Sequence, residues 1–207
     1  AGYSNQGTSS VAIGNAAGQY SQGYNSVAVG FESGQTLQGE NSVSIGYSAG
    51  KSTQGRNAVA IGKDSGQLNQ GDYAVAIGTS AGTNTQGQYS VAIGKSAGQV
   101  DQGGNCVSIG YNAGESTQGY QSVAIGYHAG YKSQGSTSIA VGSLAGQSNQ
   151  GVGCVAIGYE AGKHTQGENS VAIGKLAGSN YQAINSIIIN ATGSVLNNPN
   201  ADSTKIA

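Results

Sequence analysis

One short motif returns every sixteen residues along this chain, and that fixed spacing limits the folds open to it. The string "SVAVG" occupies residues 26–30, "SVSIG" residues 42–46 and "AVAIG" residues 58–62. The spacing continues without an insertion from Gly2 to about Asn190. Such a strict period indicates a repeat architecture, in which each copy is one structural unit stacked on the next.

The repeat unit is too short and too rich in glycine for helices. Val or Ile falls at the second and fourth places of each five-residue motif, the period of two that indicates a strand with one apolar face. Glycine supplies 37 of the 207 residues, a density that disfavours helices, and helical-hairpin repeats need about 33 residues or more. The sequence therefore predicts an all-β fold, a parallel β-roll or β-solenoid of about twelve sixteen-residue coils stacked about 4.8 Å apart.

The repeat also predicts how the chain is divided and which residues fill its core. Residues 1–190 form the repeat domain, and residues 191–207 form a C-terminal cap or a connector to a downstream region. We expect the Val and Ile positions to stack inside the coil as two aliphatic ladders. This predicted core consists of Val11, Ile13, Val27, Val29, Val43, Ile45, Val59, Ile61, Val75, Ile77, Val91, Ile93, Val107, Ile109, Val123 and Ile125.

A glutamine recurs in every copy, from Gln6 to Gln182. Side-chain amides at a fixed spacing can stack along the axis, each donating a hydrogen bond to the next, as they do in cross-β assemblies. The predicted glutamine ladder consists of Gln22, Gln38, Gln54, Gln70, Gln86, Gln102, Gln118, Gln134, Gln150 and Gln166.

The alternate face of the same strand carries only small residues, which predicts that a partner chain packs against it. The expected core is thin: two aliphatic side chains contribute about 1.5–3 kcal/mol each, whereas ordering each residue costs on the order of 1.5 kcal/mol. Oligomerisation is one way for so small a core to become stable. The predicted oligomer face consists of Ala12, Ser26, Ala28, Ser42, Ser44, Ala60, Ala76, Ala92, Cys106, Ser108, Ala124 and Cys154.

The two cysteines occupy the same repeat position three coils apart. Stacking places Cys106 and Cys154 ~14 Å from each other, beyond the ~7 Å that a disulfide can bridge. They are interpreted as small replacements for serine at a packed face, and a contact between equivalent cysteines of different chains stays open.

The strings "NSVAVG" (residues 25–30), "NSVSIG" (41–46) and "NSVAIG" (169–174) resemble the head repeats of YadA-type trimeric autotransporter adhesins. The resemblance implies left-handed parallel β-rolls packed side by side as a homotrimer, with the Ser and Ala positions facing the threefold axis. It also implies attachment to host surfaces such as extracellular matrix. The invariant "QG" and constant period depart from the less regular adhesin heads. The ending "INATG" onward is similar to segments that close head-like repeats in large-virus and phage fibre proteins.

Composition and charge exclude several function classes. The formal net charge is -1, so nothing favours a nucleic-acid or anionic-membrane partner. No apolar run approaches the ~20 residues that span a bilayer, and no signal peptide is visible. Because the chain starts at Ala1 in mid-repeat, we expect it to be a piece of a longer protein. The resemblance implies an extracellular location, on a bacterial or virion surface.

No constellation of catalytic or metal-binding residues emerges from the repeat. "AGKST" (residues 49–53) lacks the spacing of a phosphate-binding loop, and His128 and His164 have no ligand partners at a suitable spacing. The calcium-binding "GGxGxD" roll motif is missing, and Asn190-Ala-Thr is one isolated glycosylation sequon. We therefore expect no enzyme activity, no cofactor and no metal.

Four tyrosines share the position that follows the strand glycine: Tyr47, Tyr111, Tyr127 and Tyr159. Exposed tyrosine is typical of recognition surfaces, but a tyrosine that caps the edge of a thin core fits the sequence equally well.

The function favoured is that of a structural and adhesive fibre head or shaft, which presents a surface to a host receptor, matrix protein or glycan. The alternative is an ice-binding or other surface-binding solenoid. Ice-binding faces usually need regular threonines, and Thr36, Thr53, Thr85, Thr117 and Thr165 are expected to be scattered over variable positions.

Overall fold

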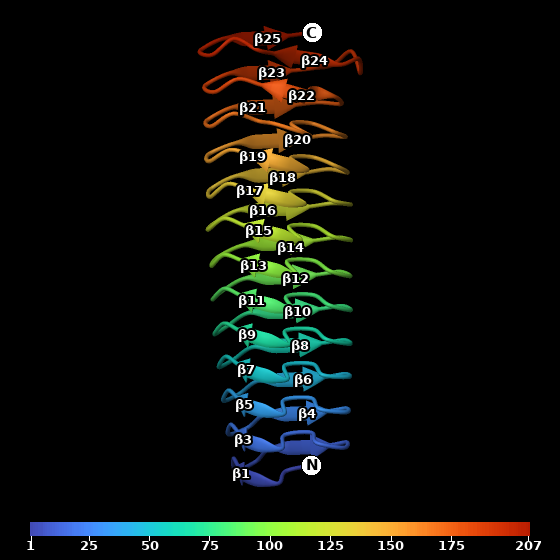
Figure 1. The fold of residues 1–207 in the computed structure, drawn as a ribbon, viewed down its shortest axis with the longest axis vertical. Helices are drawn as coiled ribbons and strands as arrows, with labels where there is room; N and C mark the ends of the chain where they lie inside the picture. The colour runs from blue at the N-terminus through green and yellow to red at the C-terminus, as the bar shows by residue number, and fades with distance from the viewer. The chain divides into compact units, whose positions relative to one another are not determined.

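The computed structural model describes all 207 residues and contains no helix. It confirms the predicted fold, a parallel β-solenoid of about 13 coils of ~16 residues (Figure 1). The chain divides into two compact units, Ala1–Asn105 and Cys106–Ala207. Each unit is built from stacked coils that contribute one strand to each of two parallel sheets.

In the Ala1–Asn105 unit each strand is three residues long and pairs with the strand one coil away. The register is sixteen residues throughout, for example Val75 opposite Val91 and Gln70 opposite Gln86. The odd-numbered sheet contains β1 (Ser4–Gln6), β3 (Tyr20–Gln22), β5 (Thr36–Gln38), β7 (Ser52–Gln54), β9 (Leu68–Gln70), β11 (Asn84–Gln86) and β13 (Val100–Gln102). The even-numbered sheet contains β2 (Val11–Ile13), β4 (Val27–Val29), β6 (Val43–Ile45), β8 (Val59–Ile61), β10 (Val75–Ile77) and β12 (Val91–Ile93).

The Cys106–Ala207 unit continues the same plan and changes it at the end. Its Val and Ile sheet contains β14 (Val107–Ile109), β16 (Val123–Ile125), β18 (Ile139–Val141), β20 (Val155–Ile157), β21 (Val171–Ile173), β23 (Ile187–Ile189) and β25 (Thr204–Ile206). The opposite layer contains β15 (Ser116–Gln118), β17 (Lys132–Gln134), β19 (Ser148–Gln150), and the pair β22 (Ala177–Gln182) and β24 (Leu196–Asn198).

The interior of the coil is filled by Ala, Ser, Cys and Gln, so the predicted inward and outward faces of the Val and Ile strands are exchanged. The small residues expected to meet a partner chain are inside: apart from the half-buried Ala12 of a terminal coil, they have no exposed surface. The residues expected inside are exposed or half-buried. The incorrect core positions are Val11, Ile13, Val27, Val29, Val43, Ile45, Val59, Ile61, Val75, Ile77, Val91, Ile93, Val107, Ile109, Val123 and Ile125, and the incorrect oligomer-face positions are Ala12, Ser26, Ala28, Ser42, Ser44, Ala60, Ala76, Ala92, Cys106, Ser108, Ala124 and Cys154.

The physical reason for the exchange is the thinness of the coil. A Cβ atom built on Gly34 would lie 3.2 Å from the Cβ of Ala28 and 2.7 Å from Oε1 of Gln38. The two layers are therefore separated by little more than one small side chain, and in the regular sixteen-residue coils a Val or Ile directed inward would overlap the opposite layer. An alternating strand has two faces, and its period does not say which of them is buried.

The glutamine column links the two sheets of each coil. Gln86 is 1% exposed, and its Nε2 donates hydrogen bonds to the main-chain oxygens of Val75 (2.9 Å) and Ser90 (3.3 Å). The predicted amide-to-amide bond between coils is present at several places, including Gln54 to Gln70 and Gln70 to Gln86, both 3.1 Å. The bond to the opposite strand's carbonyl recurs in every coil from Gln22 to Gln182, so it is the more regular of the two.

A serine precedes most of the Val and Ile strands, and its hydroxyl donates a hydrogen bond to a carbonyl in a turn. Ser26 Oγ donates to the carbonyl of Gly39 in the next coil at 2.7 Å, and Ser90 Oγ does the same to Gly103. Cys106 Sγ and Cys154 Sγ replace this hydroxyl, donating to Gly119 and Gly167 at 2.9 Å. The interpretation of the cysteines as small replacements for serine agrees with these contacts.

Glycine is required where consecutive coils touch at the turn after the Val and Ile strand. Gly30 has φ +126°, and a Cβ atom there would lie 2.5 Å from the carbonyl oxygen of Gly46. Left-handed backbone is also frequent at residues other than glycine, since the centre of every odd-numbered strand from β1 to β19 has a φ near +55°. Asn, Asp and Ser, which tolerate this conformation better than most residues, occupy many of those centres.

The last coils differ from the repeat. Ile188 occupies an interior position that is Ala or Ser in the earlier coils and is fully buried. The register lengthens by one residue there, with Ile187 opposite Thr204. Asn190 is 4% exposed, and its Nδ2 donates to the carbonyls of Lys175 and Ser194. The amide of the Asn190 sequon is therefore committed inside the fold, where it is not accessible to a glycan.

Replacing Gln86 with alanine should lower the free energy of unfolding by about 2–4 kcal/mol, because it removes two buried hydrogen bonds and opens a cavity. Urea denaturation followed by circular dichroism measures the change. Gln88→Ala is the matched control, since Gln88 is exposed, and it should alter the midpoint very little. Equal effects of the two substitutions would contradict the structural role of the glutamine column.

Candidate functional site

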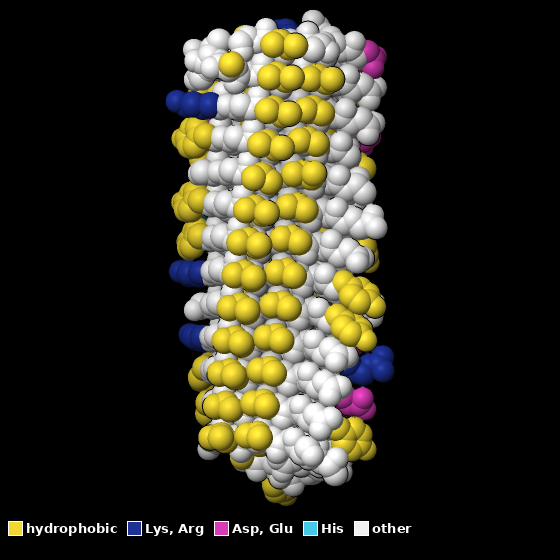
Figure 2. Space-filling view, turned by 180° about the vertical axis from the view of Figure 1, so that it is seen from behind, with side chains coloured by type: hydrophobic (Ala, Val, Ile, Leu, Met, Phe, Trp, Pro, Cys, Tyr) yellow, Lys and Arg dark blue, Asp and Glu magenta, His cyan; other side chains and the backbone are white.

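The outer surface of the Val and Ile sheet is the most distinctive feature of each unit. Figure 2 shows two adjacent columns of hydrophobic side chains on this face, one formed by each apolar position of the repeat. In the coils away from the chain ends the isoleucines are only partly covered, for example 38% exposed at Ile45 and 36% at Ile93. The valines beside them are half-buried.

The opposite sheet has a different outer surface. Its strands expose mainly Ser, Thr, Asn and Asp, with Tyr20, Leu37, Leu68 and Tyr181 as exposed hydrophobic residues. The expectation of scattered threonines is wrong in part: Thr53, Thr85 and Thr117 all lie at the centre of a strand, in β7, β11 and β15. Asn69 and Asp101 interrupt that series.

One outer face of the solenoid is apolar and the opposite outer face is polar. A protein surrounded only by water would gain nothing from such an apolar face. Single exposed apolar residues are normal on monomers, but extended patches bordered by polar residues mark interaction sites. Each coil places two aliphatic residues, Val or Ile, on this face. The outer surface of the sheet is therefore a candidate interface.

The four predicted contact tyrosines are exposed at one of the two turns of the coil. Tyr47, Tyr111, Tyr127 and Tyr159 have between 43% and 53% of their surface exposed, so they do not seal the interior. Phe31 stacks on Tyr47 with ring centroids 5.1 Å apart, and Tyr111 stacks on Tyr127 at 5.6 Å. The ammonium of Lys63 lies 5.8 Å from the Tyr47 ring centroid, within cation–π range.

His128 lies among three tyrosine rings. Its ring centroid is 4.2 Å from that of Tyr127 and 4.6 Å from that of Tyr131, both edge-on, and 5.5 Å from that of Tyr111. Partial burial lowers the pKa of His128, and the negative charge of Glu115 opposes that shift. The structure thus places His128 in an aromatic cluster, while His164 is exposed in a different part of the coil.

A small charged group accompanies Tyr159. The Tyr159 hydroxyl bonds to the Glu160 carboxylate, which raises the pKa of Tyr159. Glu160 also pairs with Lys163 at 3.1 Å. Partial burial works against ionisation of Glu160, but the hydrogen bonds from Lys163 and Tyr159 outweigh it and lower its pKa.

Neither a metal site nor a phosphate loop is formed. No group of three or more His, Cys, Asp and Glu side chains is close enough to hold an ion. Lys51 of the "AGKST" segment pairs with Glu32 at 2.7 Å, and Gly50 lies in a turn of the coil. The chain has no helix with the length and apolar character needed to cross a bilayer.

The geometry is that of a β-solenoid repeat protein with one apolar sheet surface and aromatic residues at one turn of the coil. A family model described as the YadA head domain repeat matches the chain twice, over residues 38–65 and 70–97. The chain therefore carries YadA-like head repeats, as the sequence strings predict. YadA-type heads belong to trimeric adhesins that are exposed on bacterial surfaces. No curated protein sequence gives a significant match.

The two thiols provide a test of the interior. Neither cysteine forms a disulfide and both are fully buried, and burial raises the pKa of the Cys154 thiol, which disfavours the reactive thiolate. Ellman's reagent should therefore react with the native chain at pH 8 at least about a hundredfold more slowly than with the chain in concentrated urea. Rapid reaction of both thiols in the native chain would contradict their placement inside the coil.

Proposed function

We propose that this chain is the head or shaft of a homotrimeric adhesive fibre, with the Val and Ile face of each chain turned toward its two partners. The observation that carries the proposal is the continuous apolar surface of the β2 to β12 sheet, which recurs on the β14 to β23 sheet of the second unit. Covering this surface removes two partly exposed aliphatic side chains per coil from water, at about 25 cal/mol per Å². The YadA-like repeats support the trimeric state.

The chemistry of the opposite sheet supports this orientation. Its Ser, Thr, Asn and Asp side chains are suited to water and give little reason for association. The aromatic column lies at a turn of the coil rather than on the apolar sheet, where a receptor can reach it in an assembled fibre. The role is structural and adhesive, and the location is the surface of a bacterium or a virion.

Charged substitutions on the apolar face should dissociate the assembly. The wild-type chain is expected to sediment at three times 20.4 kDa, and the Ile45→Lys, Ile93→Lys double variant at the mass of one chain, because buried unpaired charges are strongly unfavourable. The matched control is Leu37→Lys with Leu68→Lys, two exposed positions of the opposite sheet, which should leave the trimer intact. A wild-type monomer would overturn the proposed assembly and bring other surface-binding functions forward.

Attachment should depend on the exposed tyrosine column. Replacing Tyr111, Tyr127 and Tyr159 together with alanine should reduce binding of the trimer to cultured host cells or to matrix-coated wells by about tenfold or more, since aromatic side chains dominate recognition energies. Tyr73→Ala with Tyr89→Ala is the control, because these residues are equally exposed and stacked at 5.1 Å but lie at another repeat position. Undiminished attachment by the triple variant, with its trimeric mass unchanged, would exclude the column as the contact surface.

A further inference from the structure

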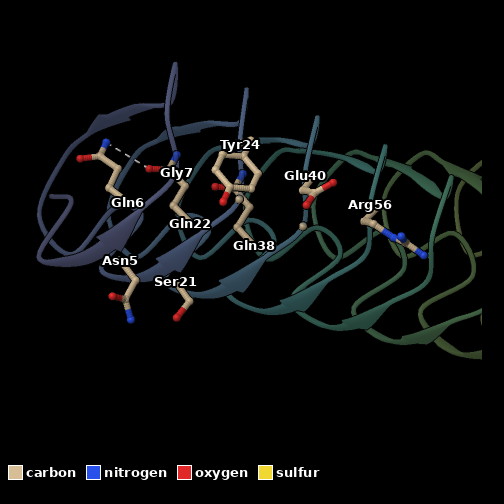
Figure 3. A pocket seen from close by; sticks show the side chains of 11 residues that line it. Asn5, Gln6, Gly7, Ser21, Gln22, Tyr24, Gln38, Glu40 and Arg56 are labelled. Atoms are coloured by element: carbon tan, nitrogen blue, oxygen red, sulfur yellow. Dashed lines mark hydrogen bonds between the residues drawn. The ribbon is translucent and has the colours of Figure 1, made fainter.

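A shallow hollow lies along one edge of the Ala1–Asn105 unit, beside the turns that follow β1, β3 and β5 (Figure 3). Its volume is about 480 Å³, within the range of about 300–1,000 Å³ that is typical of small-molecule sites. Tyr24, Glu40 and Arg56 stand in a row along it, and Asn5 and Ser21 project from the other side of the strands relative to the glutamines. This is not the turn that carries the tyrosine column.

The floor of the hollow is bare main chain. A Cβ atom on Gly23 would lie 2.6 Å from the carbonyl carbon of Gly39, so stacking of the coils itself excludes side chains there. The floor amides are already used, since Gly7 N donates to Gln22 O and Gly23 N to Gln38 O, both at 2.8 Å. The floor therefore offers no free strand edge to a peptide, and the side chains of the walls determine what binds.

Tyr24 is the aromatic wall of the hollow and is 54% exposed. It is also the one aromatic residue at its repeat position within this unit. The other coils of the unit carry Thr8, Glu40, Arg56, Asp72, Gln88 and Gly104 at that position. A flat ring beside bare backbone gives a platform for an apolar molecular surface.

The charges around the platform disfavour an anionic ligand. The Glu40 side chain is exposed, and its carboxylate makes no ion pair within the chain. Arg56 extends away from Glu40, and its Nη2 lies 3.3 Å from Oδ2 of Asp72, whose Oδ1 accepts the Arg56 main-chain N–H at 2.8 Å. The guanidinium charge is therefore matched by Asp72, while that of Glu40 stays uncompensated. A phosphate, sulfate or sialic acid would meet this negative charge.

We propose that the hollow binds an uncharged saccharide. A pyranose ring has an apolar C–H face that can stack on Tyr24 and a rim of hydroxyls that can donate to the Glu40 carboxylate and exchange hydrogen bonds with Asn5 and Ser21. Charge-assisted bonds of the Glu40 type are the stronger ones. This site lies on a different part of the surface from the tyrosine column. A single chain supplies all of its residues, so saccharide binding does not depend on trimer formation.

The test is an array of immobilised neutral oligosaccharides built from hexoses and N-acetylhexosamines, printed beside sialylated and sulfated ones and probed with the labelled full chain. The strongest neutral glycan is then titrated by calorimetry against the wild type and variants. Tyr24→Ala should weaken binding about three- to tenfold, the worth of one aromatic contact, and Glu40→Gln by several-fold. Tyr120→Ala is the matched control, since Tyr120 has the same repeat position in the second unit and is 66% exposed; it should bind like the wild type.

Three results would overturn the proposal: no glycan bound on the array, binding confined to acidic glycans, or equal losses from Tyr24→Ala and Tyr120→Ala. Circular dichroism of each variant checks that it is folded. Because saccharide binding is measured on the purified chain, its failure is distinguishable from failure of trimer formation, which the sedimentation measurement reports separately.

Discussion

The hydrogen bond from each buried glutamine to the carbonyl of the opposite strand is the interaction on which the rest of this structure depends. The interior of the regular coils is too narrow for large aliphatic side chains, so it is not stabilised by a conventional hydrophobic core. Gln86 and its counterparts bridge the gap with a long, flat amide that donates a hydrogen bond to the carbonyl of Val75 or its equivalent. Alanine and serine fill the remaining space, as Ala28 and Ser26 do with no exposed surface.

The same narrowness creates the candidate interface. Because Val and Ile have no room inside, the chain places them on the outer face of one sheet, and that face remains apolar in every coil from Val27 to Ile173. A single coil with this surface is marginal in water, which gives association a direct physical cause. The adhesive role proposed for the turns is compatible with this division, since turn residues such as Tyr127 vary between coils without changing either sheet.

Regular coils also allow local sites to differ. The glycine at the start of one turn is fixed by contact between coils, whereas the residue after it changes from Tyr24 to Glu40 to Arg56 in successive copies. Such positions combine freely into short surface segments, of which the hollow beside Tyr24 is one and the aromatic cluster around His128 is another. The two stacked sheets therefore hold these turn positions in place without restricting which residues occupy them.

The sequence by itself determined the period, the parallel pairing of strands, the turns and the buried glutamine column, because each of these follows from residue types that recur at a fixed spacing. It could not determine which face of the Val11 to Ile13 strand and its successors is inside, since alternation is symmetric between the two faces. Only the tertiary structure decided this, through the distance between the two layers, which admits Ala28 and excludes Val27 and Val29. The hollow beside Tyr24 was equally beyond sequence reasoning, because it depends on side chains from consecutive coils that lie sixteen residues apart.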